Sequence, residues 1–272
     1  NPRAGVSYTL AERNNFYLSF AVAQKEPTRS DFTDRYKFAA DDTYPSSEKL
    51  YDWELGYQYT APRLSLGVNL YYMKYKDQLV PTGMVNDDSN ALNTNVPDSY
   101  RRGVELSASW RATGWFTVGA NATFSQNRIE NYVDALKDSP TYGKELGDMT
   151  IAYSPDVIAN AFLNFHHRGF EAVFHTQHVG KQYFTNNEND ALSLDAYCVT
   201  NLNLAYTFRT RSARSVRLGL LINNLFNAEY ESNGYGYSYM DTWSGPAPVR
   251  IDEAYYFPQA PLNVLANVTV KF

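Results

Sequence analysis

The sequence ends in a stretch, residues 263–272, whose apolar and polar side chains alternate with a period of two. Because successive side chains of a β-strand point to opposite faces, we expect a strand with one apolar and one polar face. Only Leu265, an apolar residue on the polar parity, breaks the pattern. Helical spacing is nowhere sustained, so the sequence predicts an all-β fold of about 11 strands. The other predicted strands are 2–10, 15–22, 51–59, 64–72, 100–110, 116–124, 157–165, 169–179, 198–208 and 216–222.

The connections between these stretches alternate between about three to six residues and about 12 to 36 residues. Short turns on one side and long loops on the other are typical of a transmembrane antiparallel β-barrel. The predicted long loops are 24–49, 76–98, 127–155, 181–193 and 227–262. A charge on the lipid-facing side at mid-membrane would cost about 2–4 kcal/mol, and the centres of the apolar faces carry none. These central residues are Leu55, Val68, Leu106, Ala120, Leu202, Leu220 and Val268.

Composition is consistent with a barrel and excludes several other classes. The 23 Tyr and 15 Phe would supply aromatic girdles at the membrane interfaces. No run of about 18 apolar residues occurs and the mean hydropathy is −0.47, so no transmembrane helix is encoded. The net charge of −5 and the lack of a basic stripe argue against nucleic acid as a partner. A single cysteine, Cys198, excludes an internal disulfide framework and a multi-thiolate metal site.

The number of predicted strands suggests that the barrel extends beyond this chain. Bacterial single-chain barrels have an even number of strands, with both ends on the short-turn side. The last predicted strand ends on that side, so counting back places the start of the first strand on the long-loop side. Either one strand is unrecognised or the chain is the C-terminal part of a larger barrel, and the lack of a secretory signal at Asn1 favours the second interpretation.

Two motifs resemble those of TonB-dependent outer-membrane receptors. One lies within residues 221–227, which run into Tyr230 and resemble the penultimate strand of that family; its central residues are Asn223, Asn224, Leu225 and Phe226. The other, residues 100–106, resembles the family's Arg-x-Gly-Val-Glu-Leu strand. The terminal Phe272 resembles the insertion signal that the barrel-assembly machinery reads. In sequence, these motifs most resemble those of receptors from Bacteroidetes-type bacteria.

The resemblance implies a 22-stranded barrel with an N-terminal plug domain, of which residues 1–272 would be the C-terminal half without the plug. It implies active uptake of a scarce nutrient across the outer membrane of a Gram-negative bacterium, driven through the plug by TonB–ExbB–ExbD. An iron–siderophore is the first substrate candidate, with haem, cobalamin, a glycan or a peptide as alternatives. Outer-membrane lipid, the barrel-assembly machinery and a surface lipoprotein are the further expected partners, and no cofactor is expected.

The longest predicted loop carries the best ligand-binding candidates. Tyr and Trp offer large contact areas with a polar tip, which suits bulky aromatic or metal-chelate ligands. The alternative is that these side chains pack on one another and fold the loop over the barrel mouth. The expected substrate-binding residues are Tyr235, Tyr237, Tyr239, Trp243, Arg250 and Tyr255.

Other clusters favour structural roles. His175 and His178 would lie on opposite faces of one strand, while His166 and His167 lie at a turn, so no metal site follows. The acidic segments 86–90 and 41–42 are more typical of solvated loops than of Ca²⁺ sites. Glu54, Glu105 and Glu171 are expected to face the lumen and pair with wall residues such as Arg3 or Arg101.

No Gly-x-Ser-x-Gly nucleophile motif occurs, so no catalytic residue is expected. A passive porin or structural barrel is the alternative function, and an outer-membrane hydrolase is a more remote one. An upstream plug domain with a TonB-contact motif would distinguish a receptor from a pore.

Overall fold

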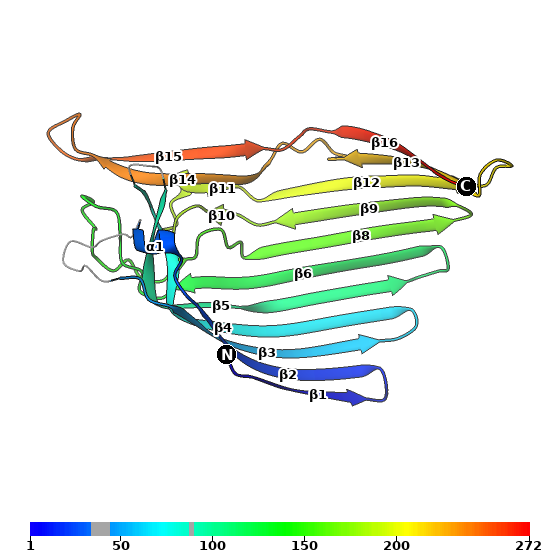
Figure 1. The fold of residues 1–272 in the computed structure, drawn as a ribbon, viewed down its shortest axis with the longest axis horizontal. Coiled ribbons are helices and arrows are strands. Elements are labelled where there is room, and N and C mark those ends of the chain that lie inside the picture. The colour runs from blue at the N-terminus through cyan, green and yellow to red at the C-terminus, as the bar shows by residue number, and fades with distance from the viewer. Residues whose placement is uncertain (34–43, 87–89) are drawn as a thin grey trace.

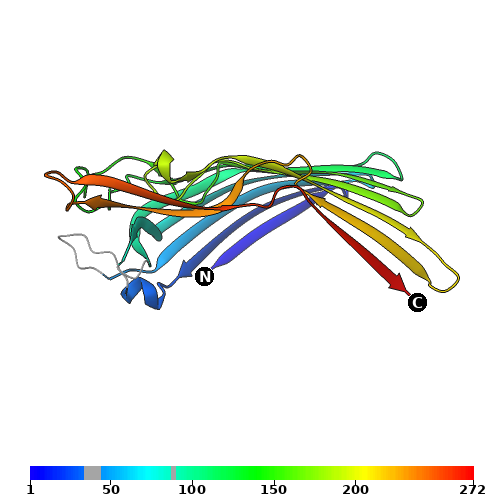
Figure 2. The ribbon, with the colours of Figure 1, turned by 90° about the horizontal axis from the view of Figure 1, so that it is seen from above.

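The computed structural model describes residues 1–33, 44–86 and 90–272. Eleven antiparallel strands follow one another in hydrogen-bonded order and form an arched wall whose two edges are β1 and β16 (Figures 1 and 2). This order confirms the prediction of about 11 strands. The strands are β1 (Arg3–Leu10), β2 (Asn14–Lys25), β3 (Glu48–Thr60), β4 (Leu64–Val85), β5 (Ala91–Arg111), β6 (Phe116–Ile129), β8 (Val157–His167), β9 (Phe170–Val179), β12 (Tyr197–Phe208), β13 (Ser215–Asn223) and β16 (Asn263–Lys271).

The strand register sorts side chains onto two faces. One row of partners runs Tyr57, Val68, Leu106, Ala122 and Ala159, and forms part of what we call the apolar face. The next row is shifted by one residue and belongs to the polar face: Gln58, Gly67, Ser107, Asn121 and Asn160. The exceptional Leu265 lies opposite Leu221, so two leucines that interrupt the polar parity meet across β13 and β16.

An aromatic row crosses the apolar face near the long connections. The Phe20 ring lies 5.1 Å from Trp53, and Trp53 lies 5.8 Å from Tyr72. The row continues to Tyr100, whose ring lies 5.0 Å beneath the Arg102 guanidinium. Tilted ring pairs and a cation above a ring are favourable geometries. This aromatic row, with a cationic side chain at its end, has the composition expected of the girdle that barrel strands place at the membrane surface.

The prediction that residues 76–98 form a loop is wrong. The β4 strand continues to Val85 and β5 begins at Ala91, so this hairpin extends well beyond the aromatic row. Its register shifts between Pro81 and Val85, where Gly83 has a φ of +79°. The two strands continue beyond the aromatic row because their apolar side chains pack against the end of β6 and the connection that follows it. The packed cluster consists of Val80, Val96, Ile129, Tyr132 and Ile151.

The other long connections also contain ordered elements. The predicted loop 227–262 folds into a hairpin, β14 (Glu231–Asp241) with β15 (Val249–Pro258). The remaining elements are α1 (Arg29–Thr33), β7 (Met149–Thr150), β10 (Gln182–Tyr183), η1 (Asp190–Leu192) and β11 (Ser193–Leu194). In the described ranges, neither helix has the length and apolar content needed to cross a membrane.

Short turns and long connections lie at opposite ends of the wall, as the connection lengths predict. The first strand starts at the end with the long connections, and β16 finishes at the end with the short turns (Figure 1). The side bearing the long connections is called the loop side below.

Candidate functional site

The asparagines of the 223–227 motif close the base of the connection between β13 and β16. Asn224 is 3 % exposed, and its side-chain amide donates to the Ala228 carbonyl (2.8 Å) and the Ala260 carbonyl (3.3 Å). Its Oδ1 accepts a hydrogen bond from the Ala228 amide (2.8 Å). Asn227 accepts from the Leu262 amide (2.8 Å), which ties the start of the connection to its end. We call this group the asparagine clasp.

Backbone conformation explains why asparagine suits the clasp. Asn224 and Asn227 have φ values of +51° and +52°, a region that asparagine tolerates better than most residues. Asn223 donates to Asn263 across the strands at 2.9 Å. The Phe226 side chain is 76 % exposed. The motif therefore positions the β14–β15 hairpin on the loop side.

One face of this hairpin packs on the connection that carries β10, η1 and β11. Gly234 and Ser238 are buried, and a Cβ at Gly234 would lie 2.7 Å from the ring of the fully buried Phe184. A Cβ at Gly236 would lie 2.9 Å from Leu192 and 3.0 Å from Phe184, so only glycine allows this approach.

The opposite face carries four tyrosines around one carboxylate. Tyr235 and Tyr255 are cross-strand partners whose rings stack at 4.9 Å. The Tyr237 and Tyr255 hydroxyls donate to Glu253 Oε2 at 2.6 and 2.8 Å, and the Tyr239 hydroxyl donates to Oε1 at 3.2 Å. We call this group the tyrosine face.

These hydrogen bonds have electrostatic consequences. The hydrogen bonds from Tyr237 and then Tyr255 lower the pKa of Glu253, because they stabilise its charged form. In return, the hydrogen bond to Glu253 is the main reason that the pKa of Tyr237 is raised. The face therefore presents protonated phenols around an ionised carboxylate at neutral pH.

The hairpin brings together four of the six predicted ligand residues, namely Tyr235, Tyr237, Tyr239 and Tyr255. Arg250 lies on the other face, where its guanidinium donates to Asp252 (2.8 Å) and Ser238 (3.2 Å). Trp243 lies at the hairpin tip and is 92 % exposed. Glu253 was not among the predicted residues, although it shares the parity of Tyr255 and could have been found from that alternation.

Gly236→Val should separate the hairpin from its support, because the added side chain would overlap Leu192, Phe184 and the Glu253 carbonyl. Overpacking of this kind typically costs about 1–3 kcal/mol. Hydrogen exchange of β14 and β15 in the purified protein should therefore speed up markedly. Gly245→Val is the matched control at the open tip, where a Cβ would approach only the Ala247 carbonyl, at 4.0 Å. Equal effects of the two substitutions would contradict this packing.

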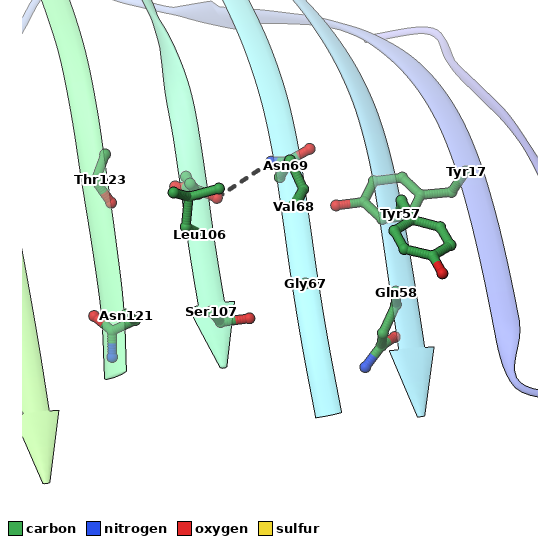
Figure 3. A pocket seen from close by; sticks show the side chains of 11 residues that line it. Tyr17, Tyr57, Gln58, Gly67, Val68, Asn69, Leu106, Ser107, Asn121 and Thr123 are labelled. Carbon is green, nitrogen blue, oxygen red and sulfur yellow. Dashed lines mark hydrogen bonds between the residues drawn. The ribbon is translucent and has the colours of Figure 1, made fainter. Parts of the chain in front are cut away.

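The polar face of the wall holds a recess of about 400 Å³ (Figure 3). The Tyr17 ring lies over Gly56, where a Cβ would be 2.0 Å from the ring. Asn69 donates to Glu105 at 3.2 Å. The other polar side chains lining the recess are Gln58, Ser107, Asn121 and Thr123.

The pairing expected for the wall carboxylates is only partly right. Glu171 forms a bidentate salt bridge with Arg217, with N–O distances of 2.7 and 2.9 Å. Its partner is therefore another wall residue, and not Arg3 or Arg101. Arg101 instead donates to Ser154 at 2.8 Å. Glu54 accepts a long hydrogen bond of 3.5 Å from the Ser19 hydroxyl. The register between β9 and β13 across β12 decides this pairing, and single-strand parity does not contain it.

His175 and His178 lie on opposite faces of β9 as predicted, whereas His166 and His167, predicted at a turn, are the last residues of β8. His175 lies opposite Phe162 and Asn201, while His178 lies on the other face, opposite Ala159 and Cys198. In the described ranges, no group of three or more His, Cys, Asp or Glu side chains gathers as a metal site. Residues 41–42 and 87–89 of the acidic segments lie outside the described residues. Phe272 follows β16 and is 93 % exposed.

Solved structures share this fold along nearly the whole chain. The ferric yersiniabactin uptake receptor FyuA from Yersinia pestis superposes with a TM-score of 0.68 at 18 % identity, over 99 % of this chain and 37 % of its own. The copper transporter OprC gives 0.70 at 18 % identity, over 98 % and 39 %. The ferric citrate transporter FecA in its unliganded form gives 0.67 at 16 % identity, over 98 % and 37 %. The chain thus spans less than two fifths of the length of these proteins.

The family model for the TonB dependent receptor-like beta-barrel matches residues 1–225. TonB-dependent receptors are non-enzymatic transporters of the Gram-negative outer membrane. The eleven-strand antiparallel wall, its aromatic row and this match lead to one conclusion: the chain belongs to the TonB-dependent receptor family, as part of the β-barrel of an outer-membrane protein.

Proposed function

We propose that the receptor to which this chain belongs imports a scarce nutrient carried as a metal chelate, with an iron–siderophore complex as the first candidate. Residues 1–272 would form the C-terminal part of its barrel wall, and a plug outside this chain would couple uptake to TonB–ExbB–ExbD. The tyrosine face is the observation that carries the proposal, because stacked and hydroxyl-bearing rings suit planar, polar chelating groups.

The names of the similar structures support the same substrate class. They are described as receptors or transporters of ferric yersiniabactin, ferric citrate and copper. The ligand would first meet the loop side, where the asparagine clasp holds the hairpin. Lipid would cover the apolar face, and a surface lipoprotein remains a candidate partner for the loop side.

Replacing Tyr235, Tyr237, Tyr239 and Tyr255 with Ser in the full-length receptor should weaken binding of its chelate at least tenfold, since each aromatic contact contributes about 0.5–1.5 kcal/mol. Binding and uptake of ferric siderophores, haem and cobalamin should be compared in cells that depend on this receptor. Trp115→Ser is the control, because this exposed side chain lies in the short turn between β5 and β6, away from the loop side.

Unchanged binding by the fourfold variant would remove the tyrosine face from ligand recognition. Uptake that persists without TonB would instead favour the alternative of a passive pore. The two outcomes are separable, since binding is measured at the cell surface and uptake inside the cell.

A further inference from the structure

Five oxygen atoms meet on the tyrosine face: three phenol hydroxyls and both carboxylate oxygens of Glu253. The contacts of 2.6, 2.8 and 3.2 Å bring Tyr237, Tyr255 and Tyr239 to the same carboxylate. The Tyr239 and Tyr255 side chains are exposed, so solvent ions can reach the cluster. Phenolate and carboxylate oxygens are hard ligands, which suit hard and highly charged cations.

The Glu253 carboxylate is stabilised by neutral phenols and not by a cationic side chain in the described part of the chain. Within the described part of the chain, no Lys or Arg forms an ion pair with Glu253, and its hydrogen-bond donors are the three phenols. Arg250, three residues from Glu253 along β15, is held by Asp252 on the opposite face of the hairpin. The cluster is therefore anionic, and the hydrogen atoms that stabilise it are ones that a metal ion can displace.

We propose that Tyr237, Tyr239, Tyr255 and Glu253 form a direct binding site for ferric iron on the β14–β15 hairpin. On binding, the O–H bond of each coordinating phenol breaks, an O–Fe bond forms, and the proton passes to the buffer. Iron stays in the ferric state throughout. Three phenolates and one carboxylate would place four negative charges around the 3+ charge of one ferric ion.

The hydrogen bonds of the free cluster favour a trivalent over a divalent ion. To coordinate a metal, each phenol must give up the proton that it donates to Glu253. A bound cation lowers the pKa of its ligands, and this effect grows with its charge. Ferric iron can therefore displace these protons, whereas Ca²⁺ or Mg²⁺ would leave the phenols protonated.

The test uses the full-length receptor, purified in detergent and titrated with ferric nitrilotriacetate. Coordination should produce a visible phenolate-to-iron charge-transfer band that saturates at one iron per receptor and strengthens as the pH rises. Tyr237→Phe and Glu253→Gln should each weaken iron binding by about 10–100-fold. Tyr235→Phe is the matched control: its ring also stacks on Tyr255, but its hydroxyl is not one of the three on Glu253.

Several results would overturn the site. These are the absence of a band, a band that survives both Tyr237→Phe and Glu253→Gln, or equal loss in Tyr235→Phe. Competition by excess Ca²⁺ would also contradict a site selective for trivalent ions. Hydrogen exchange of the hairpin should match between the variants, which separates lost ligands from lost folding. The site does not rest on the proposed uptake function, because the band is measured without TonB or transport.

Discussion

Leu106→Arg should destabilise the membrane-embedded barrel by about 2–4 kcal/mol, the cost of an arginine on a lipid-facing strand near the bilayer midplane. Leu106 lies on the apolar face, between Val68 and Ala122 in the strand register, and is 41 % exposed. Ser107→Arg, one residue further along β5, should cost only about 0.5 kcal/mol. Ser107 lines the polar recess beside Asn69 and Asn121, where an arginine can remain hydrated (Figure 3).

This pair of variants tests the assignment of faces, because the two substitutions share strand, depth and chemistry. Reversible unfolding of the receptor in phospholipid vesicles, followed by tryptophan fluorescence, gives the two free-energy differences. Equal costs at both positions, or a larger cost at Ser107, would mean that the apolar face is not the lipid-facing one.

Asn224→Ala should open the asparagine clasp at a total cost of about 2.5–6.5 kcal/mol. It removes three side-chain hydrogen bonds at a buried position, each contributing about 0.5–1.5 kcal/mol. It also places alanine at a φ of +51°, which adds about 1–2 kcal/mol. Hydrogen exchange at the Ala228 amide, which the Asn224 side chain protects, should accelerate at least 30-fold.

Asn224→Gly separates the two contributions. Glycine accepts the positive φ without strain, so this variant should lose the hydrogen bonds alone and recover about 1 kcal/mol relative to alanine. If glycine and alanine are equally destabilising, backbone conformation contributes nothing to the clasp. If neither affects exchange, the base of the hairpin is held by Asn227 and the strand pairing instead.

The membrane-facing part of the wall could be predicted because lipid and lumen impose a strict alternation on each strand. Residues 64–72 and 100–110 show this alternation, and both lie within observed strands. Outside the membrane the constraint ends. Val80 and Val96 are buried by Ile129 at the end of β6 and by Tyr132 just after it. The sequence of 76–98 therefore resembles a polar loop, although residues 76–85 and 91–98 lie in paired strands.

The candidate site shows the same division. The tyrosines of 230–256 were predicted to lie in a long ligand-binding loop, but these residues form the β14–β15 hairpin, and its pairing places Arg250 and Tyr255 on opposite faces. The pairing of Glu171 with Arg217 likewise depends on strands that are 46 residues apart in sequence. These contacts arise from register between distant segments, which local alternation does not encode.

For this protein, the sequence alone determined the strand order, the two faces and the side on which each long connection lies, because alternation and connection length are local properties. The asparagine motif likewise predicted where β13 ends. Only the tertiary structure decided which side chains share a site. Three tyrosines meet on Glu253 because the hairpin register places Tyr237 opposite Glu253 and Tyr255 two residues further along.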